Sequence, residues 1–348
     1  MGAGEPLTGG RRASEVHVLG AALLLAFLVM WALNPDRFLT AANLRSMGCQ
    51  LPELGLLSLA MMVTMVSGGI DLSIVSASNL AGIVAAMVSQ SLLGAPASGA
   101  GAVGGTAVAL VAGLSASLLV GLVNGWLAGA AGVSPILATL GTMHLVAGLG
   151  LVLTGGGSIS GLPATIGSLG NGLFCGVPVP LWIFGASAMA LDVVMRRTPW
   201  GFRLHLLGAN PTATLFSGVN NRHVLLLAYA LSGLLSGLAG IVMIARFNSA
   251  RAGYGESYLL IAILAAVLGG TSPTGGFGRV SGTVLALAIL QVLSSGLNLL
   301  RVSAFLTAAL WGLTILAVMG LNRAVERWRV AAPSPTAGCG PSPLGQRL

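Results

Sequence analysis

Reactive side chains are few in this chain and lie far apart. The candidates for metal binding or redox chemistry are Cys49, Cys175, Cys339, His17, His144, His205 and His223. The cysteines show no spacing typical of a metal or redox site, and the histidines do not cluster. No Ser/His/Asp or paired-carboxylate arrangement lies within plausible reach. We therefore expect no catalytic residue and no metal site, and we interpret these side chains as packing or surface residues.

The absence of lysine excludes two further chemistries. All sixteen basic residues are arginine. A Walker A loop needs a lysine to reach the phosphates of ATP, and a Schiff base needs a lysine amine. The segment 269–278, GGTSPTGGFG, superficially resembles a phosphate-binding loop but lacks both the lysine and the β-strand context. We predict instead a tight cytoplasmic re-entrant turn between two helices, and no cofactor bound by this chain.

Asp71 is the most notable acid, because it follows a glycine pair, Gly68 and Gly69, in an apolar region. Carboxylates near a membrane core are energetically costly and are often functional. The glycines free the backbone here, so Asp71 could cap the helix that follows a broken-helix junction. The alternative is that Gly69 and Asp71 form a hinge or line a translocation path. We count Asp71 and Asp192 as the only acids inside or bordering the apolar runs, with Asp192 beside Arg196 at a helix end.

Neutral polar residues interrupt other apolar runs. Asn124 and Asn298 could each form an interhelical hydrogen bond, which contributes roughly 1 kcal/mol in a membrane protein. Alternatively, they could contact a solute along a translocation path, and Ser76 and Thr139 belong to the same candidate set. A path for a neutral polar solute is expected to contain Asn, Ser and Thr with few charges, and this chain fits that description.

The composition places these residues in an all-α polytopic membrane protein. Hydrophobic residues make up 55% of the chain and charged residues 7%, whereas soluble domains carry about 25% charged residues. Apolar runs long enough to cross a bilayer predict about ten transmembrane helices. The runs are 17–34, 51–68, 73–93, 102–130, 134–154, 179–195, 223–245, 256–270, 280–300 and 303–321. The long fourth run is expected to be tilted or broken.

Arginine predicts the orientation of these helices. The side of the two termini carries ten arginines up to residue 329, and the opposite loops carry five. Because cytoplasmic loops are enriched in basic residues, both termini are predicted to be cytoplasmic, and the net charge of +8 does not indicate a nucleic-acid partner. The predicted organisation is a cytoplasmic segment 1–16, a transmembrane domain 17–322 with a cytoplasmic loop 196–222, and a disordered cytoplasmic tail 323–348.

One polar segment inside that loop, residues 208–219, predicts a short helix of about two turns. Asn210 is a good N-cap, Pro211 suits the first helical position, and Gly218 suits the stop. An apolar stripe would be formed by Thr212, Leu215, Phe216 and Val219. A helix this short is marginal in water by itself, so it must pack against something, and a partner protein is the natural candidate.

Several motifs occur together in one order along residues 20–320. They are GIDLS at 69–73, GLVNG at 121–125, PILATLGTM at 135–143, the polar segment at 208–219, and LGGTSPTGGFG at 268–278. This order resembles the permease subunit of ribose/xylose/galactose-type ABC importers. The resemblance implies the ABC importer permease fold, a second permease copy or paralogue, an extracytoplasmic sugar-binding protein and a partner ATPase that binds ATP and Mg²⁺. It also implies a multi-pass protein of the bacterial cytoplasmic (inner) membrane, surrounded by lipid.

By its resemblance to these permeases, the polar segment 208–219 corresponds to the coupling helix that docks on the ATPase. The residues assigned to ATPase coupling are Gly208, Asn210, Pro211, Ala213, Leu215, Phe216, Ser217 and Gly218. The implied function is import of a monosaccharide, with ATP hydrolysed by the partner and not by this chain. Two alternatives remain open: an ABC permease for nucleosides or another small polar solute, and a stand-alone secondary carrier.

Overall fold

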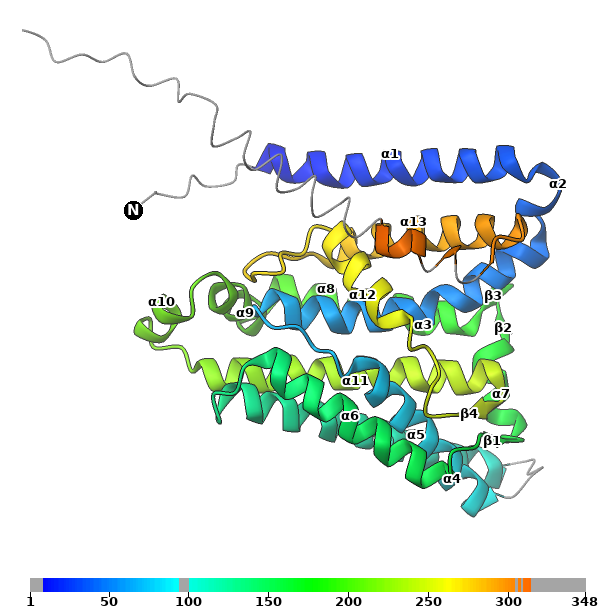
Figure 1. The fold of residues 1–348 in the computed structure, drawn as a ribbon, viewed down its shortest axis with the longest axis horizontal. Coiled ribbons are helices and arrows are strands. Elements are labelled where there is room, and N and C mark those ends of the chain that lie inside the picture. Colours follow the sequence, from blue (N-terminus) through cyan, green and yellow to red (C-terminus); the bar gives the residue numbers. More distant parts are fainter. Residues whose placement is uncertain (1–8, 94–99, 304–305, 308, 314–348) are drawn as a thin grey trace, which may run out of the picture.

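The computed structural model describes residues 9–93, 100–303, 306–307 and 309–313. The helices lie roughly parallel in a bundle, with α9 and α10 at one end and the four short strands and α7 at the other (Figure 1). We call these the α10 end and the strand end. The predicted tail 323–348 and the start of the predicted segment 1–16 lie outside the described residues.

The described elements are helical apart from four two-residue strands. The helices are α1 Gly9–Leu33, α2 Pro35–Phe38, α3 Ala41–Val66, α4 Ile74–Leu93, α5 Ala100–Gly129, α6 Pro135–Thr154, α7 Ala164–Asn171, α8 Val179–Arg197, α9 Pro199–Ala209, α10 Pro211–Phe216, α11 Asn221–Phe247, α12 Tyr258–Leu268 and α13 Val280–Leu299. The strands are β1 Ile159–Ser160, β2 Leu173–Phe174, β3 Val177–Pro178 and β4 Ser249–Ala250. Strand β1 pairs with β4, and β2 pairs with β3, both antiparallel.

The expected count of about ten spanning helices is only approximate. Seven helices among the described residues are long and apolar enough to cross a membrane. Two more apolar helices are shorter, His17–Leu33 and Tyr258–Leu268. The predicted run 303–321 falls mostly outside the described residues. The all-α membrane class is confirmed, while the end positions differ because tertiary contacts decide where each helix begins.

Helix α12 illustrates such a contact. The backbone from Arg251 to Ser257 is not helical, so α12 begins only at Tyr258. Asn79 of α4 donates hydrogen bonds to the carbonyl oxygens of Ala252, at 2.7 Å, and Tyr254, at 2.9 Å. Irregular backbone in a membrane bundle is tolerated where protein groups satisfy its hydrogen bonds. With eleven residues, α12 is about 16 Å long, roughly half of a bilayer core.

The core is organised around α3 and α11. Helix α3 begins at Ala41, ten residues before the predicted start, and every residue from Pro52 to Val66 is buried. Within their most apolar windows, α3 is 83% buried and α11 is 67% buried, whereas α5, α6 and α8 are at most 28% buried. The first two helices therefore lie inside the bundle, and the other three present apolar side chains outward, as expected at a lipid-facing surface.

Small residues let the central helices approach closely. A side chain at Gly121 of α5 would collide with the carbonyl oxygen of Tyr229 in α11, and one at Gly240 of α11 would collide with that of Ser78 in α4. Contacts of this kind are typical of membrane helices, where van der Waals packing replaces the hydrophobic effect. Helix α5 is continuous over thirty residues, about 45 Å, so the long fourth run is not broken.

Candidate functional site

Helix α10 forms where its caps predict it. The Asn210 side chain accepts a hydrogen bond from the backbone N–H of Ala213 at 2.9 Å, and Pro211 is the first helical residue. The helix ends after Phe216, and Gly218 adopts a positive φ of 78°, a backbone conformation that residues with a side chain adopt only with strain. Asn221 of α11 donates to the carbonyl oxygen of Pro211 at 2.9 Å, which ties the start of α10 to its neighbour.

The predicted apolar stripe of α10 is divided between the protein and its surroundings. Val219 packs against the main hydrophobic core. Leu215 is 60% exposed and Phe216 is 86% exposed. Two large apolar side chains therefore project from the α10 end on a well-capped helix. A capped helix with an uncovered apolar tip is the form expected of an element that inserts into a groove on another protein.

Three chain segments meet at the end of α9, just before α10. We call the four glycines at this contact, Gly68, Gly208, Gly275 and Gly276, the glycine junction. A side chain at Gly208 would collide with the carbonyl oxygen of Val66 and with the backbone nitrogen of Gly276. The Gly276 N–H donates to that same carbonyl at 2.9 Å. The junction thus joins the C-terminal end of α3, the end of α9 and the turn 269–279. The predicted tight turn between two helices, α12 and α13, is confirmed.

We expect Gly208→Ala to destabilise the protein by about 1–3 kcal/mol, because the added methyl group has backbone on two sides and cannot be accommodated by a side-chain rotation. Thermal unfolding of the purified protein in detergent measures this change. Gly185→Ala in α8 is the matched control, since a side chain there meets nothing within 4 Å. Equal unfolding temperatures for the two variants would contradict the close packing at the junction.

Asp71 lies in a buried hydrogen-bond network that links four helices. Its Oδ1 accepts from the Ser73 backbone N–H at 3.0 Å and from the Ser73 hydroxyl at 2.7 Å, and its Oδ2 accepts from Ser232 of α11 at 2.8 Å. Asn124 of α5 donates to the Ser73 hydroxyl at 2.8 Å. Thr142 of α6 donates to Asn124 Oδ1 at 2.7 Å. The network therefore fastens the start of α4 to α5, α6 and α11.

The remaining predicted path residues surround this network, with one exception. Thr139 donates to the Pro135 carbonyl at 2.8 Å, and Ser76 donates to the Ser73 carbonyl at 2.9 Å. Gly69 lies against the Tyr229 hydroxyl, where any side chain would collide. Asn298 is apart from them, exposed near the C-terminal end of α13. The structure thus assigns Asn124 an interhelical bond, and a path role for this set stays a prediction.

Asn124→Leu separates those two interpretations. Leucine has a similar size but can neither donate to the Ser73 hydroxyl nor accept from Thr142. Ser73 still donates to Asp71 and Thr142 still donates to the Thr139 carbonyl, so we expect a loss of about 1–2 kcal/mol in stability. Thermal unfolding measures the loss, and the transport rate is measured at a temperature where the variant is folded. An unchanged unfolding temperature with a slowed transport rate would instead indicate a path residue.

The sequence interpretation overlooked one buried acid, Glu53. This residue of α3 is fully buried, and Arg246 Nε of α11 lies 2.6 Å from its Oε1. The arginine also lies over the ring of Phe247, 4.4 Å from its centroid, and next to Tyr258 of α12. Glu53 could have been found from the sequence, because it lies inside the predicted run 51–68. Asp71 and Asp192 are therefore not the only acids in or bordering the apolar runs. Asp192 does pair with Arg196, at 2.8 Å.

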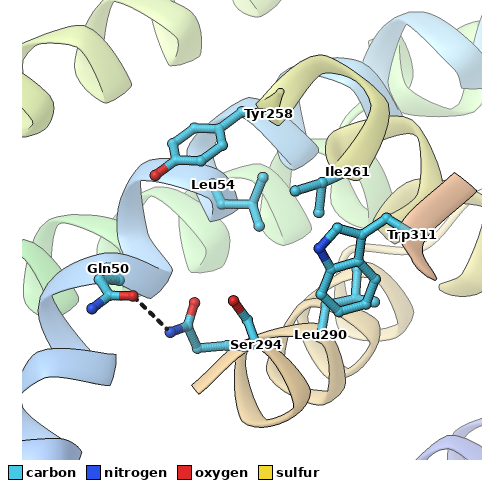
Figure 2. A pocket seen from close by; sticks show the side chains of 8 residues that line it. Gln50, Leu54, Tyr258, Ile261, Leu290, Ser294 and Trp311 are labelled. Carbon is cyan, nitrogen blue, oxygen red and sulfur yellow. Dashed lines mark hydrogen bonds between the residues drawn. The ribbon is translucent and has the colours of Figure 1, made fainter. Parts of the chain in front are cut away.

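A polar pocket lies beside this ion pair, between α3, α12 and α13 (Figure 2). We call it the seam pocket. Its polar lining residues are Gln50, Tyr258, Gln291, Ser294 and Trp311, and its apolar ones are Leu54, Ile261 and Leu290. The cavity measures about 60 Å³. The sequence analysis missed this site, although Gln50 and Gln291 are amides at the edge of, or inside, otherwise apolar runs.

Comparisons with known proteins show the family of this chain. The family described as "Branched-chain amino acid transport system / permease component" matches residues 47–319. The Ribose import permease protein RbsC of Bacillus subtilis (strain 168) is 37% identical over 303 residues, which cover 86% of this chain and 90% of that protein. RbsC of Escherichia coli (strain K12) is 36% identical over 288 residues, covering 82% and 86%.

A third relative carries a different name. The Autoinducer 2 import system permease protein LsrD of Yersinia enterocolitica (serotype O:8 / biotype 1B, strain NCTC 13174 / 8081) is 33% identical over 314 residues, covering 88% of this chain and 92% of that protein. No solved structure shows a significant match. The resemblance noted in the sequence is confirmed: with its bundle of apolar spanning helices, this chain belongs to the family of transport-system permease components.

Proposed function

We propose that this chain is the membrane permease of an ABC importer that moves a monosaccharide, and that a partner ATPase docks on α10. The observation that carries the proposal is the exposed tip of α10, Leu215 and Phe216, on a helix capped by Asn210 and bonded to Asn221 of α11. The names of the relatives, ribose and autoinducer-2 import permeases, support a neutral polar solute of sugar size.

The proposed coupling follows from the contacts of α10. ATP binding closes the ATPase dimer, and α10 moves with the groove that holds it. Only Asn210 separates α10 from α9, and Gly208 of α9 touches the end of α3 and the turn before α13. A displacement of α10 therefore acts on the inner ends of α3 and α13. Because packed helices move as rigid bodies, the bundle switches between inward and outward openings around the solute.

The proposal also assigns an orientation and partners. The α10 end faces the cytoplasm, since loop 196–222 carries Arg196, Arg197, Arg203 and Arg222. The strand end then faces the binding protein on the outside of the bacterial inner membrane. A second permease copy or paralogue completes the channel, and ATP and Mg²⁺ belong to the ATPase.

Purification and reconstitution test this proposal. The tagged chain is purified from its native membrane, an ABC ATPase is expected to co-purify, and the complex is reconstituted into liposomes with the binding protein. We expect uptake of D-ribose that requires ATP on the ATPase side and is unaffected by ion gradients. Uptake by the chain alone, driven by an ion gradient without ATPase, would favour a stand-alone secondary carrier and overturn the proposal.

A further inference from the structure

We infer that the seam pocket binds hydroxyl groups of the neutral solute as it passes through the outer half of the permease. This inference rests on the proposed function and adds to it a specific contact site on α3, α12 and α13. It differs from the buried network around Asp71, whose polar groups are already hydrogen-bonded to one another.

The position of the pocket is the first argument. Val66, at the glycine junction, lies sixteen positions after Gln50 in α3, about 24 Å along a helix. The pocket therefore lies in the half of the bundle near the strand end. Helix α12 begins at the pocket with Tyr258 and runs to the turn that contacts the junction. Two elements thus connect the pocket directly to the segments behind α10.

The chemistry of the lining is the second argument. None of the described lining residues is charged, which favours a neutral solute over an ion. Figure 2 shows the Ser294 hydroxyl and the Trp311 indole nitrogen facing the same space, and Gln291 is only 5% exposed while lining it. Amides and a serine hydroxyl can each donate and accept, as sugar hydroxyl groups do, and an indole ring offers an apolar face to C–H groups.

An exchangeable hydrogen bond is the third argument. Gln291 Nε2 donates to Gln50 Oε1 across the pocket at 3.4 Å, longer than the usual 2.7–3.2 Å for such bonds. A solute hydroxyl placed between the two amides could accept from one and donate to the other, so the long bond would be replaced by two shorter ones. Opening this contact therefore carries little energetic penalty when a polyhydroxylated solute is present.

The size of the pocket limits what it holds in this conformation. A volume of about 60 Å³ corresponds to roughly two water molecules, whereas a cavity that holds benzene is about 150 Å³. The pocket therefore takes one or two hydroxyl groups at the edge of a solute and not a whole sugar ring. Passage of the ring requires α12 or α13 to move, which matches the connection of both helices to the glycine junction.

Transport by variants of the reconstituted complex provides the first test. We expect Gln291→Leu to slow ATP-dependent D-ribose uptake about fivefold to tenfold, the effect of one lost hydrogen bond, and Ser294→Ala to slow it less. Ser295→Ala is the matched control, because Ser295 bonds Asn43 at 2.9 Å and does not line the pocket. Co-elution with the ATPase shows that each variant is folded. Rates equal to that of the control would overturn the inference while leaving the proposed function intact.

Cysteine labelling gives a second readout that does not depend on transport. Ser294→Cys is placed in a chain whose Cys49, Cys175 and Cys339 are replaced by serine, and alkylation by N-ethylmaleimide is timed in the purified complex. D-ribose is expected to slow alkylation, and the charged analogue D-ribonate is not; Ser295→Cys is the control. Absence of protection by D-ribose would overturn the pocket assignment. Uptake by the wild-type chain alone, driven by an ion gradient without ATPase, would separately overturn the proposed function.

Discussion

Phe216→Asp is expected to abolish association with the partner ATPase while leaving the permease folded. The Phe216 side chain is 86% exposed, so its replacement removes little packing within this chain and is expected to leave the fold intact. Buried aromatic anchors at protein interfaces contribute about 2–4 kcal/mol to the binding free energy. Loss of such an anchor corresponds to a roughly 30-fold to 700-fold larger dissociation constant. An aspartate also introduces a charge into the apolar groove, which increases the loss.

Association is measured by co-purification and by titration of the ATPase against the permease in nanodiscs. Phe174→Asp is the matched control, since Phe174 is 62% exposed but belongs to β2 at the strand end, in edge-to-face contact with Trp182. We expect that variant to bind the ATPase normally. If Phe216→Asp retains the wild-type affinity, α10 is not the docking element, and the assignment of residues 208–218 to coupling is wrong.

The second large effect concerns the ion pair of Glu53 and Arg246. Removing one partner from a buried pair leaves an uncompensated charge and costs about 3–5 kcal/mol. We therefore expect Glu53→Leu to lower the free energy of unfolding by that amount, because the Arg246 side chain is only 17% exposed and Glu53 is fully buried. Unfolding of the purified protein in detergent, followed by intrinsic tryptophan fluorescence, measures the change.

The double variant Glu53→Leu/Arg246→Met provides the control for this prediction. With both charges removed, no unpaired charge remains in the core, and buried pairs replaced by apolar residues are often neutral in stability. We expect the double variant to recover most of the stability that the single variant loses. A double variant as unstable as Glu53→Leu would show that the loss comes from packing of α3 and not from the stranded charge on α11.

Local features of the sequence predicted the helices and α10 well. Backbone groups that face lipid must be hydrogen-bonded within their own segment, so a long apolar run predicts a spanning helix. Asn210, Pro211 and Gly218 act within one turn of the residues they cap, so their roles also follow from adjacent positions. The absence of lysine excluded a Walker A loop from composition alone.

The helix boundaries were less predictable, for a physical reason. Helix α3 extends to Ala41, and α12 is shortened to eleven residues. Hydropathy cannot indicate where α12 begins, because the Asn79 side chain, distant in sequence, satisfies the irregular backbone before it. The same limit applies to the apolar stripe of α10: Val219 packs against the core while Leu215 and Phe216 are exposed, and sequence spacing does not show which residues of a stripe are covered.

Sequence alone therefore determined the membrane class, the approximate number of spans, the permease family and a capped, exposed α10, since each depends on composition or on neighbouring residues. Only the tertiary structure decided which polar side chains meet. Asp71 bonds Ser232 across 161 positions, Glu53 pairs with Arg246, and Gln50 meets Gln291 across 241 positions. Such pairings depend on which faces of remote helices are brought together by close packing at small residues, and neither hydropathy nor spacing within one segment encodes that choice.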